Sequence, residues 1–282
     1  MRVVDAHQHF WDLEAVAYPW LTPADGPIHR TFDWPDLEPE LTASGVDATV
    51  LVQAANSVED TEAMLAQADR HAEVAGVVGW VDLTDAAAAT AVLDRFAADP
   101  RFAGIRHLIH DEPDPDWLLQ DAVLDNLGLL AERGLAFDVV AVLPRHLEHV
   151  PTLAERHPEL RLVIDHLAKP PIRDRGWEPW ASLLRRAAEY PNVYAKVSGL
   201  NTAAEWETWK PADLAPYVEH ALEVFGPGRL MYGGDWPVSI LAGGYQPVWR
   251  ATLELLAQLP DADRAQVLGG TATAVYRLPE VS

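Results

Sequence analysis

Short apolar segments alternate with stretches of helical character along almost the whole chain, and this alternation constrains the fold more than any other feature. Turn residues bound each apolar segment, as expected for strands buried on both faces. The expected strands lie around residues 3–9, 48–54, 76–83, 102–110, 136–142, 161–166, 193–198 and 229–235. The helical segments between them cover residues 58–73, 84–99, 116–134, 144–158, 179–191, 211–226 and 246–259.

Strictly alternating strands and helices predict a parallel sheet with helices packed outside it. Eight such units match a closed (β/α)₈ barrel, a fold that runs to roughly 250 residues as one domain. An open doubly wound sheet is less well supported, because no glycine-rich phosphate loop follows the first strand. With 282 residues and 49% apolar composition, we expect a single α/β domain of the TIM-barrel class.

A long segment rich in proline and tryptophan, residues 10–36, follows the first expected strand. Loops after strands lie at the active-site face of such barrels. We therefore expect this segment to form part of a substrate pocket, with a simple packed surface loop as the alternative.

The charge balance excludes several partners. The chain has 43 acidic and 21 basic residues, a net charge of −22, and no cysteine. Nucleic acid or an anionic membrane would need a basic footprint, and no stretch approaches the ~20 consecutive apolar residues of a membrane span. The missing cysteines exclude disulfides and thiolate metal sites. We expect a cytoplasmic protein that binds a small molecule and has neither nucleic acid nor membrane as a partner. The sequence does not indicate the oligomeric state.

Three polar residues, Asp5, His7 and His9, occupy every second position of the first expected strand. Side chains alternate across a strand, so these three are expected to share one face. In a barrel that face lines the lumen, with His7 and His9 nearest the catalytic end.

Two later strands also end in polar residues. The segment RLVIDHLAKP stops at Asp165 and His166 and continues to Lys169, and RLMYGGDWP opens into two glycines and Asp235. Burying such groups costs several kcal/mol unless a partner is present. We therefore expect the polar strand ends to converge, with separate structural networks at the barrel mouth as the alternative.

Imidazoles that converge with one carboxylate make a site for a divalent ion with nitrogen and oxygen ligands. They also make a metal-free acid/base site, in which the aspartate activates water directly. The residues by themselves favour neither reading over the other.

Candidate substrate-binding residues come from the strand ends and the loops that follow. In GIRHLIHDEP, Arg106 and His110 share one face, and a buried arginine is usually paired or binds an anionic or carbonyl oxygen. Lys196 in VYAKVSGL is a further candidate, with a salt-bridged lysine as the alternative. Flat aromatic rings pack against the C–H surfaces of sugars, so Trp11 and Trp236 are expected at the pocket, with core packing as the alternative.

The motifs DAHQHFWD, GIRH, VIDHLAKP, VYAKVSGL and MYGGDWPV, in this order, resemble the amidohydrolase superfamily. The similarity is to its amidohydrolase-2 branch, which contains sugar-lactone hydrolases such as fuconolactonase and rhamnonolactonase, with pyrone-dicarboxylate lactonase as a relative. The resemblance covers nearly the whole chain, and the ordered set of motifs is specific where one motif alone is not.

The resemblance implies a distorted (β/α)₈ barrel over residues 1–282 that hydrolyses an intramolecular ester. His7 and His9 match the paired histidines of strand one, His166 the histidine of strand six, and Asp235 the aspartate of strand eight. The family implies these four as metal ligands, and Asp235 and His166 as catalytic residues. No lysine ends strand four of the kind that bridges two metals, so at most one divalent ion is expected, zinc first. The lactonase branch has members with and without a need for metal.

The mechanism that follows gives Asp235 the role of general base toward a water aimed at the lactone carbonyl. The oxyanion would be stabilised by a metal held by the histidines, or by the imidazoles together with Arg106. A neutral aldonolactone suits the aromatic loops better than a dicarboxylate. The alternatives are a metal-dependent decarboxylase of an aromatic or unsaturated acid, and a non-catalytic sugar-binding barrel.

Overall fold

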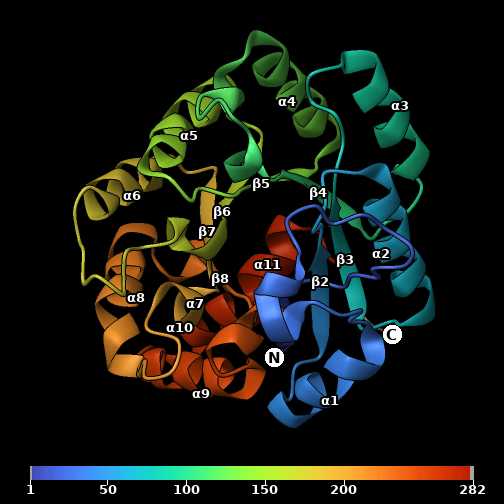
Figure 1. The fold of residues 1–282 in the computed structure, drawn as a ribbon. Helices are drawn as coiled ribbons and strands as arrows, with labels where there is room; N and C mark the ends of the chain where they lie inside the picture. The colour runs from blue at the N-terminus through green and yellow to red at the C-terminus, as the bar shows by residue number, and fades with distance from the viewer. Residues whose placement is uncertain (1, 280–282) are drawn as a thin grey trace.

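The computed structural model describes residues 2–279 and shows eight parallel strands enclosed by helices (Figure 1). Each strand pairs with the next along the chain, from β1 to β8. The strands are β1 Val4–Gln8, β2 Ala48–Val52, β3 Val74–Gly79, β4 Phe102–His107, β5 Ala136–Val139, β6 Arg161–Ile164, β7 Val193–Val197 and β8 Leu230–Tyr232. The expected single-domain (β/α)₈ barrel is confirmed. Most strands are shorter than expected because their last residues turn away to form the loops at the barrel mouth.

All seven expected helical segments contain a helix. The helices are α1 Trp34–Ser44, α2 Val58–Arg70, α3 Ala86–Phe96, α4 Asp121–Arg133, α5 Pro144–Arg156, α6 Trp180–Ala188, α7 Leu200–Ala203, α8 Pro211–Phe225, α9 Tyr245–Leu255, α10 Asp261–Ala265 and α11 Thr271–Val275. Helix α1 was not expected, although it has start and stop signals: Pro35 lies in its first turn, and Gly45 ends it in a left-handed conformation. Among residues 2–279, the longest and most apolar helices fall short of what a membrane crossing requires.

The lumen of the barrel is filled by small aliphatic side chains and closed at the amino ends of the strands by α11. Val4, Ala6 and Val50 belong to this inner cluster, together with Ala272 and Tyr276 of the C-terminal segment. Figure 1 shows α11, in red, at the middle of the ring of strands. The lumen is therefore a packed core beneath a polar upper layer, as in other barrels of this class.

The seam between β8 and β1 is closed by the residues that follow β8. Asp235 N donates to His7 O at 2.8 Å, and His9 N donates to Trp236 O at 2.8 Å. These two bonds place the aspartate beside the two histidines of the first strand, although the residues are more than 200 positions apart in the sequence.

The alternation expected along the first strand is wrong for Asp5. The pairing register of β1 with β2 shifts between Asp5 and Gln8, and such a bulge re-aims the side chains that follow it. Val4 and Ala6 therefore face the lumen, while Asp5 accepts hydrogen bonds from Gly234 N at 2.9 Å and from the Tyr245 hydroxyl at 2.7 Å. Asp5 is fully buried and ties β1 to the chain after β8.

Candidate active site

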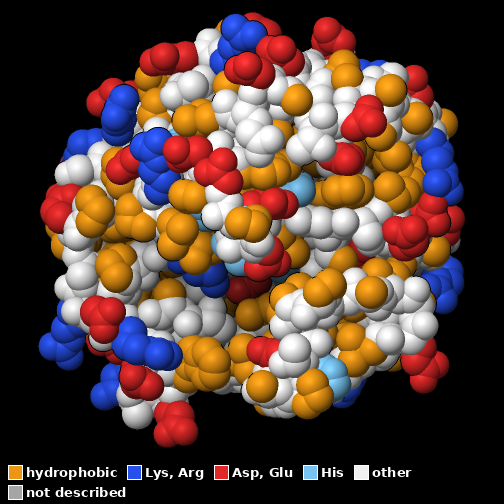
Figure 2. Space-filling view, turned by 45° about the horizontal axis from the view of Figure 1, so that its top comes forward, with side chains coloured by type: hydrophobic (Ala, Val, Ile, Leu, Met, Phe, Trp, Pro, Cys, Tyr) orange, Lys and Arg blue, Asp and Glu red, His pale blue; other side chains and the backbone are white. Residues whose placement is uncertain are grey.

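A cavity of about 160 Å³ opens where the strands end. Its polar wall consists of His9, Arg106, His110, His166, Lys169 and Asp235. Its apolar wall consists of Trp20, Ala54, Leu108, Val140, Val142 and Val238. Figure 2 shows histidine and acidic side chains near the hollow in the middle of the face, while other acidic side chains are scattered around the outline.

Four polar side chains from three strand ends meet at the floor of this cavity. Asp235 Oδ1 lies 3.6 Å from His9 Nε2 and 3.8 Å from both His7 Nε2 and His166 Nε2. The Nε2 atoms of His7 and His9 are 3.1 Å apart. The structure therefore brings together the three imidazoles and Asp235, which were expected to converge.

Two glycines before Asp235 permit this close approach. A Cβ atom at Gly233 would lie 2.7 Å from His7 Cβ, and one at Gly234 would lie 2.5 Å from the Tyr245 ring and 2.6 Å from Asp5 Oδ2. Any side chain at either position would push β8 away from β1. The segment MYGGD is thus explained by packing at the seam.

The loop after β6 has an unusual backbone conformation. Four consecutive residues, His166 to Lys169, have positive φ angles although none is glycine. Such residues cost of order 1 kcal/mol or more each and collect at functional sites. The Trp180 indole supports the turn by donating to Leu167 O at 2.6 Å. His166 Nδ1 lies 2.8 Å from Ser198 Oγ, which holds the ring with Nε2 toward the cavity.

Burial and neighbouring charges set the protonation of the site. Burial opposes ionisation of Asp235, but the imidazole of His166 and the ammonium of Lys169 outweigh it and hold the pKa of the carboxyl below its usual value. Burial, aided by the charge of Lys169, lowers the pKa of His166 to about 3. Burial and the ammonium of Lys196 lower the pKa of His7 well below 6.5. At neutral pH the site therefore presents the carboxylate of Asp235 beside the neutral imidazoles of His7 and His166.

A buried polar network lies beneath the cavity. Arg106 Nη1 is 3.1 Å from Asp165 Oδ2, and Lys196 Nζ is 3.0 Å from Asp165 Oδ1 and 2.5 Å from Asp138 Oδ2. The Tyr276 hydroxyl of the C-terminal segment completes the network at 2.8 Å from Asp138 Oδ1. Each buried charge thus has a partner of opposite sign, which burial in a barrel lumen requires.

The donor set fits one divalent cation. His9 Nδ1 is engaged by Val52 O at 2.7 Å and His166 Nδ1 by Ser198 Oγ, so their Nε2 atoms face the site, as is usual for metal-binding histidines. Asp235 Oδ2 is buried and has no hydrogen-bond partner among the described residues. Separations of 3.1–3.8 Å compare with ~3.3 Å between the ligand atoms of tetrahedral zinc. His7, His166 and Asp235 can each turn one donor atom to a common point, because these atoms all lie within 4.8 Å of one another.

The structure separates the candidate substrate-binding residues into two groups. Arg106 and His110 line the cavity. Trp11 is buried in the core, where its indole donates to Arg30 O at 2.7 Å, and Trp236 is buried against Phe32. Neither tryptophan lines the cavity, because Trp11 packs against Trp20 and Phe32, and Trp236 packs against Phe32. Lys196 is fully buried in the network below the cavity, which matches the salt-bridged alternative.

Two cavity residues, Trp20 and Lys169, were not among the candidate site residues. Trp20 comes from the Pro- and Trp-rich segment, and its indole is held by Ala54 O at 2.7 Å. Lys169 follows His166 in the left-handed turn, with Nζ 3.4 Å from Thr202 Oγ1. Their positions after strands were visible in the sequence, but which tryptophan faces the cavity depends on how the loop folds.

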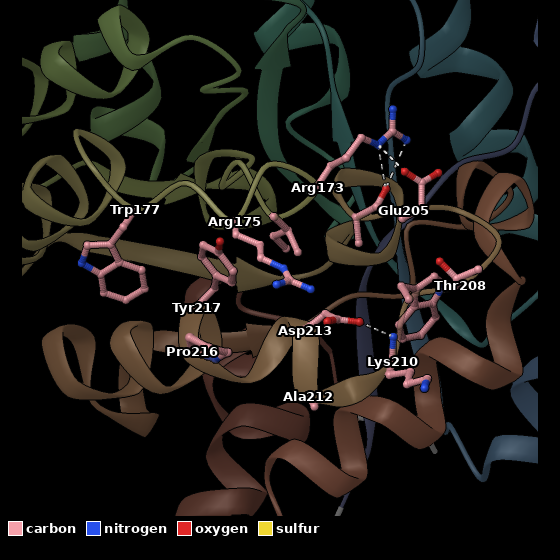
Figure 3. A pocket seen from close by; sticks show the side chains of 13 residues that line it. Arg173, Arg175, Trp177, Glu205, Thr208, Lys210, Ala212, Asp213, Pro216 and Tyr217 are labelled. Carbon is pink, nitrogen blue, oxygen red and sulfur yellow. Dashed lines mark hydrogen bonds and ion pairs between the residues drawn. The ribbon is translucent and has the colours of Figure 1, made fainter.

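A larger cavity of about 530 Å³ lies apart from these groups, between the loop after β6 and the start of α8. Figure 3 shows that its charged side chains do not converge on one point: Arg173 turns toward Glu205, and the Asp213 carboxylate accepts from Lys210 N. This cavity contains no imidazole, and the chemistry described above belongs to the smaller one.

Comparisons with known proteins agree with the geometry. A family model described as Amidohydrolase matches residues 4–278. An L-fucono-1,5-lactonase from Burkholderia ambifaria is 43% identical over 99% of this chain and 97% of its own length. A second L-fucono-1,5-lactonase, from Burkholderia multivorans, is 35% identical over 98% of this chain and 96% of its own. The crystal structure of an amidohydrolase from Burkholderia multivorans with bound zinc superimposes with a TM-score of 0.92 at 32% identity, covering 99% of this chain and all of the other.

Proposed function

The chain belongs to the amidohydrolase family, and from that premise we infer that it hydrolyses the ring ester of a sugar lactone to the open-chain aldonic acid. It is thus a hydrolase that acts on a cyclic ester. The observation that carries the proposal is the buried carboxylate of Asp235, which faces three imidazoles at the floor of the cavity.

Asp235 acts as the general base in this proposal. Its lowered pKa keeps it ionised at neutral pH, and its Oδ2 atom has no hydrogen-bond partner among residues 2–279. The carboxylate takes a proton from water as the water oxygen bonds to the lactone carbonyl carbon. When the bond between that carbon and the ring oxygen breaks, Asp235 returns the proton to the ring oxygen. Atoms and charge balance, because one water enters and one hydroxy acid leaves.

The oxyanion formed in this step needs donors or positive charge nearby. Arg106 and Lys169 are the two cations in the cavity wall, and His110 is a third donor there. Arg106 is held in place by Asp165 Oδ2 and by Gln53 O. A guanidinium fixed in this way needs little reorganisation as charge develops on the substrate.

We propose that His7, His9, His166 and Asp235 hold one divalent ion, and that zinc is the first candidate for it. When bound, such an ion supplies Lewis-acid polarisation of a carbonyl and lowers the pKa of a water. The neutral state of His7 and His166 suits this role, because an imidazole must be deprotonated to bind a metal.

The substrate we propose is an aldonolactone with a six-membered ring and a terminal methyl group, with L-fucono-1,5-lactone as the first to test. Two relatives bear that activity in their names. The cavity is polar on one set of walls and aliphatic on the other, where Leu108, Val140 and Val142 lie. Polar groups suit the lactone hydroxyls, and an aliphatic wall suits a methyl group, which has no hydrogen bond to lose on burial.

The test is a pH-indicator assay of acid release from L-fucono-1,5-lactone and from lactones that carry a terminal hydroxyl in place of the methyl group. We expect enzyme-dependent acid release, fastest for the methyl-bearing lactone. The decarboxylase alternative predicts instead CO₂ release from aromatic acids without acid release from lactones. A sugar-binding barrel would bind the lactone without turnover, and either result would refute the proposed hydrolysis.

A further inference from the structure

The ammonium group of Lys196 meets three neighbours in the barrel lumen, where the side chain is fully buried. Nζ lies 2.5 Å from Asp138 Oδ2, 3.0 Å from Asp165 Oδ1 and 3.1 Å from His7 Nδ1. An ammonium has three N–H donors and no acceptor. Asp138 Oδ2 and His7 Nδ1 accept hydrogen bonds from Nζ. Asp165 Oδ1 forms an ion pair with Nζ and has no hydrogen-bond partner among the described residues.

The partner of His7 on its other side is His9. His9 Nδ1 lies 2.7 Å from Val52 O, and a carbonyl oxygen only accepts, so the proton of a neutral His9 ring sits on Nδ1 and its Nε2 is bare. His7 Nε2 lies 3.1 Å from that bare atom. Two bare nitrogens at this distance would repel each other, whereas a proton on His7 Nε2 makes a hydrogen bond.

Both contacts assign the same tautomer to His7. A proton on Nε2 leaves Nδ1 bare to accept from Lys196, and it gives His9 Nε2 a donor. The competing donor to His7 Nε2 is Arg106 Nη1 at 3.4 Å, which is farther away and has Asp165 Oδ2 as an acceptor at 3.1 Å.

We propose that Lys196 is a positioning residue that selects the tautomer of His7, and that Asp165 supports the opposite tautomer. Asp165 Oδ1 lies 3.3 Å from His7 Nδ1 and has no hydrogen-bond partner among the described residues, so it is available to accept a hydrogen bond from a protonated Nδ1. His7 Nδ1 thus has one donor and one acceptor within reach, and the ring can be held in the same place with its proton on either nitrogen.

The two tautomers correspond to two states of the site. With the proton on Nε2, His7 is a hydrogen-bond donor at the floor of the cavity. With the proton on Nδ1, the Nε2 lone pair is free for a cation. In passing between them the ring releases the Nε2 proton to water and takes up a proton from water at Nδ1, so its charge does not change. The meaning of these states for catalysis depends on the function proposed above, but the tautomer itself does not.

The experiment uses the full chain with ¹⁵N-labelled histidine, treated with chelator, and long-range ¹H–¹⁵N correlation spectra that identify the protonated nitrogen of each ring. His7 is assigned by the signals lost in His7→Gln. We expect His7 to carry its proton on Nε2, and we expect one equivalent of zinc to move the proton to Nδ1. In Lys196→Met without metal, a population with the proton on Nδ1 should appear, because Asp165 Oδ1 is then the polar side-chain atom that remains beside Nδ1 among residues 2–279. Lys169→Met removes an ammonium that is not in contact with His7. The His7 signals of this variant should be the same as in the wild-type protein.

A proton on Nδ1 of His7 in the chelator-treated wild-type protein would overturn the proposal, and so would an unchanged His7 spectrum in Lys196→Met. Lys196→Met leaves Asp138 without its cation, which can prevent folding. The double variant Lys196→Met/Asp138→Asn removes both charges with little change in volume and should show the same shift. The spectra contain no substrate, so a failure of lactone hydrolysis leaves this test intact, and an unexpected tautomer leaves the proposed hydrolysis standing.

Discussion

Replacing Asp235 by asparagine tests the proposed base directly. The amide has nearly the size of the carboxylate, so the surrounding rings lose a charge but little packing. A positioned general base contributes about 10²–10⁴-fold in rate, or roughly 3–5 kcal/mol of transition-state stabilisation. We expect the loss of rate in Asp235→Asn to lie at the upper end of this range, because no other carboxylate of the network can replace the base. Asp165, the nearest other carboxylate of the network, is held by Arg106 and Lys196 below the cavity and cannot take over.

The assay is acid release from L-fucono-1,5-lactone, followed together with thermal unfolding. We expect Asp235→Asn to lower kcat by about 10⁴-fold and to change the melting temperature little. The matched control is Asp5→Asn, which also alters a fully buried aspartate at the seam of the barrel. Asp5 accepts from Gly234 N and the Tyr245 hydroxyl and does not line the cavity. Its variant should lose about 1–3 kcal/mol of unfolding free energy and keep most of its turnover.

The two variants therefore separate catalysis from stability. Near-wild-type lactone hydrolysis by folded Asp235→Asn would show that another group activates water, and the mechanism would be wrong. Equal losses of turnover in both variants would show that Asp235 acts through the closure of the barrel seam.

Four further outcomes follow from the geometry. Trp20→Ala should raise KM by about 2- to 13-fold with little change in kcat, because a ring that packs on the substrate contributes about 0.5–1.5 kcal/mol of binding; an unchanged KM would place the sugar elsewhere. Gly199→Ala should lower kcat by on the order of 10²-fold, since its Cβ would lie 2.6 Å from Asp235 Oδ2, whereas Gly45→Ala, with a similar positive φ and open space around it, should cost stability only. Chelation should lower lactone hydrolysis, and one equivalent of zinc should restore it; full activity after verified metal removal would contradict the metal proposal. The pKa of His166 in the folded protein is lowered to about 3. On acidification the unfolded chain therefore takes up a proton at His166 at a higher pH than the folded protein does, and the unfolding free energy should fall as pH drops from about 6.5 toward 3. Urea titrations of chelator-treated protein should show a weaker pH dependence in His166→Gln, and an equal dependence would contradict the assigned pKa.

Much of the barrel could be predicted because the signals for it are local. Alternating apolar and amphipathic segments reflect the burial of strands within a sheet and of one face of each helix. The residues that end strands converge for a topological reason, since all strands of a parallel barrel point the same way. Hence His7, His9, His166 and Asp235 could be grouped from the sequence, and the structure places them around one point.

The errors arose where a side chain depends on distant partners. Asp5 was assigned to the lumen together with His7, but Val4 and Ala6 fill the lumen beside it, and the register shift after Asp5 re-aims only the residues that follow. Helix α1 was not predicted because its first turn, which begins at Trp34, lies inside the segment rich in proline and tryptophan that was assigned to a loop.

The sequence by itself determined the order of strands and helices and the polar character of the strand ends. Both follow from short-range patterns of apolar and polar residues, because these patterns reflect which side chains are buried. Only the tertiary structure decided that Lys196 lies in a buried network with Asp138 and His7, and that Trp20 rather than Trp11 lines the cavity. These outcomes depend on contacts between residues that are 58 and 189 positions apart in the case of Lys196. A buried charge takes whichever partner the closed barrel brings within reach, and no local pattern encodes that choice.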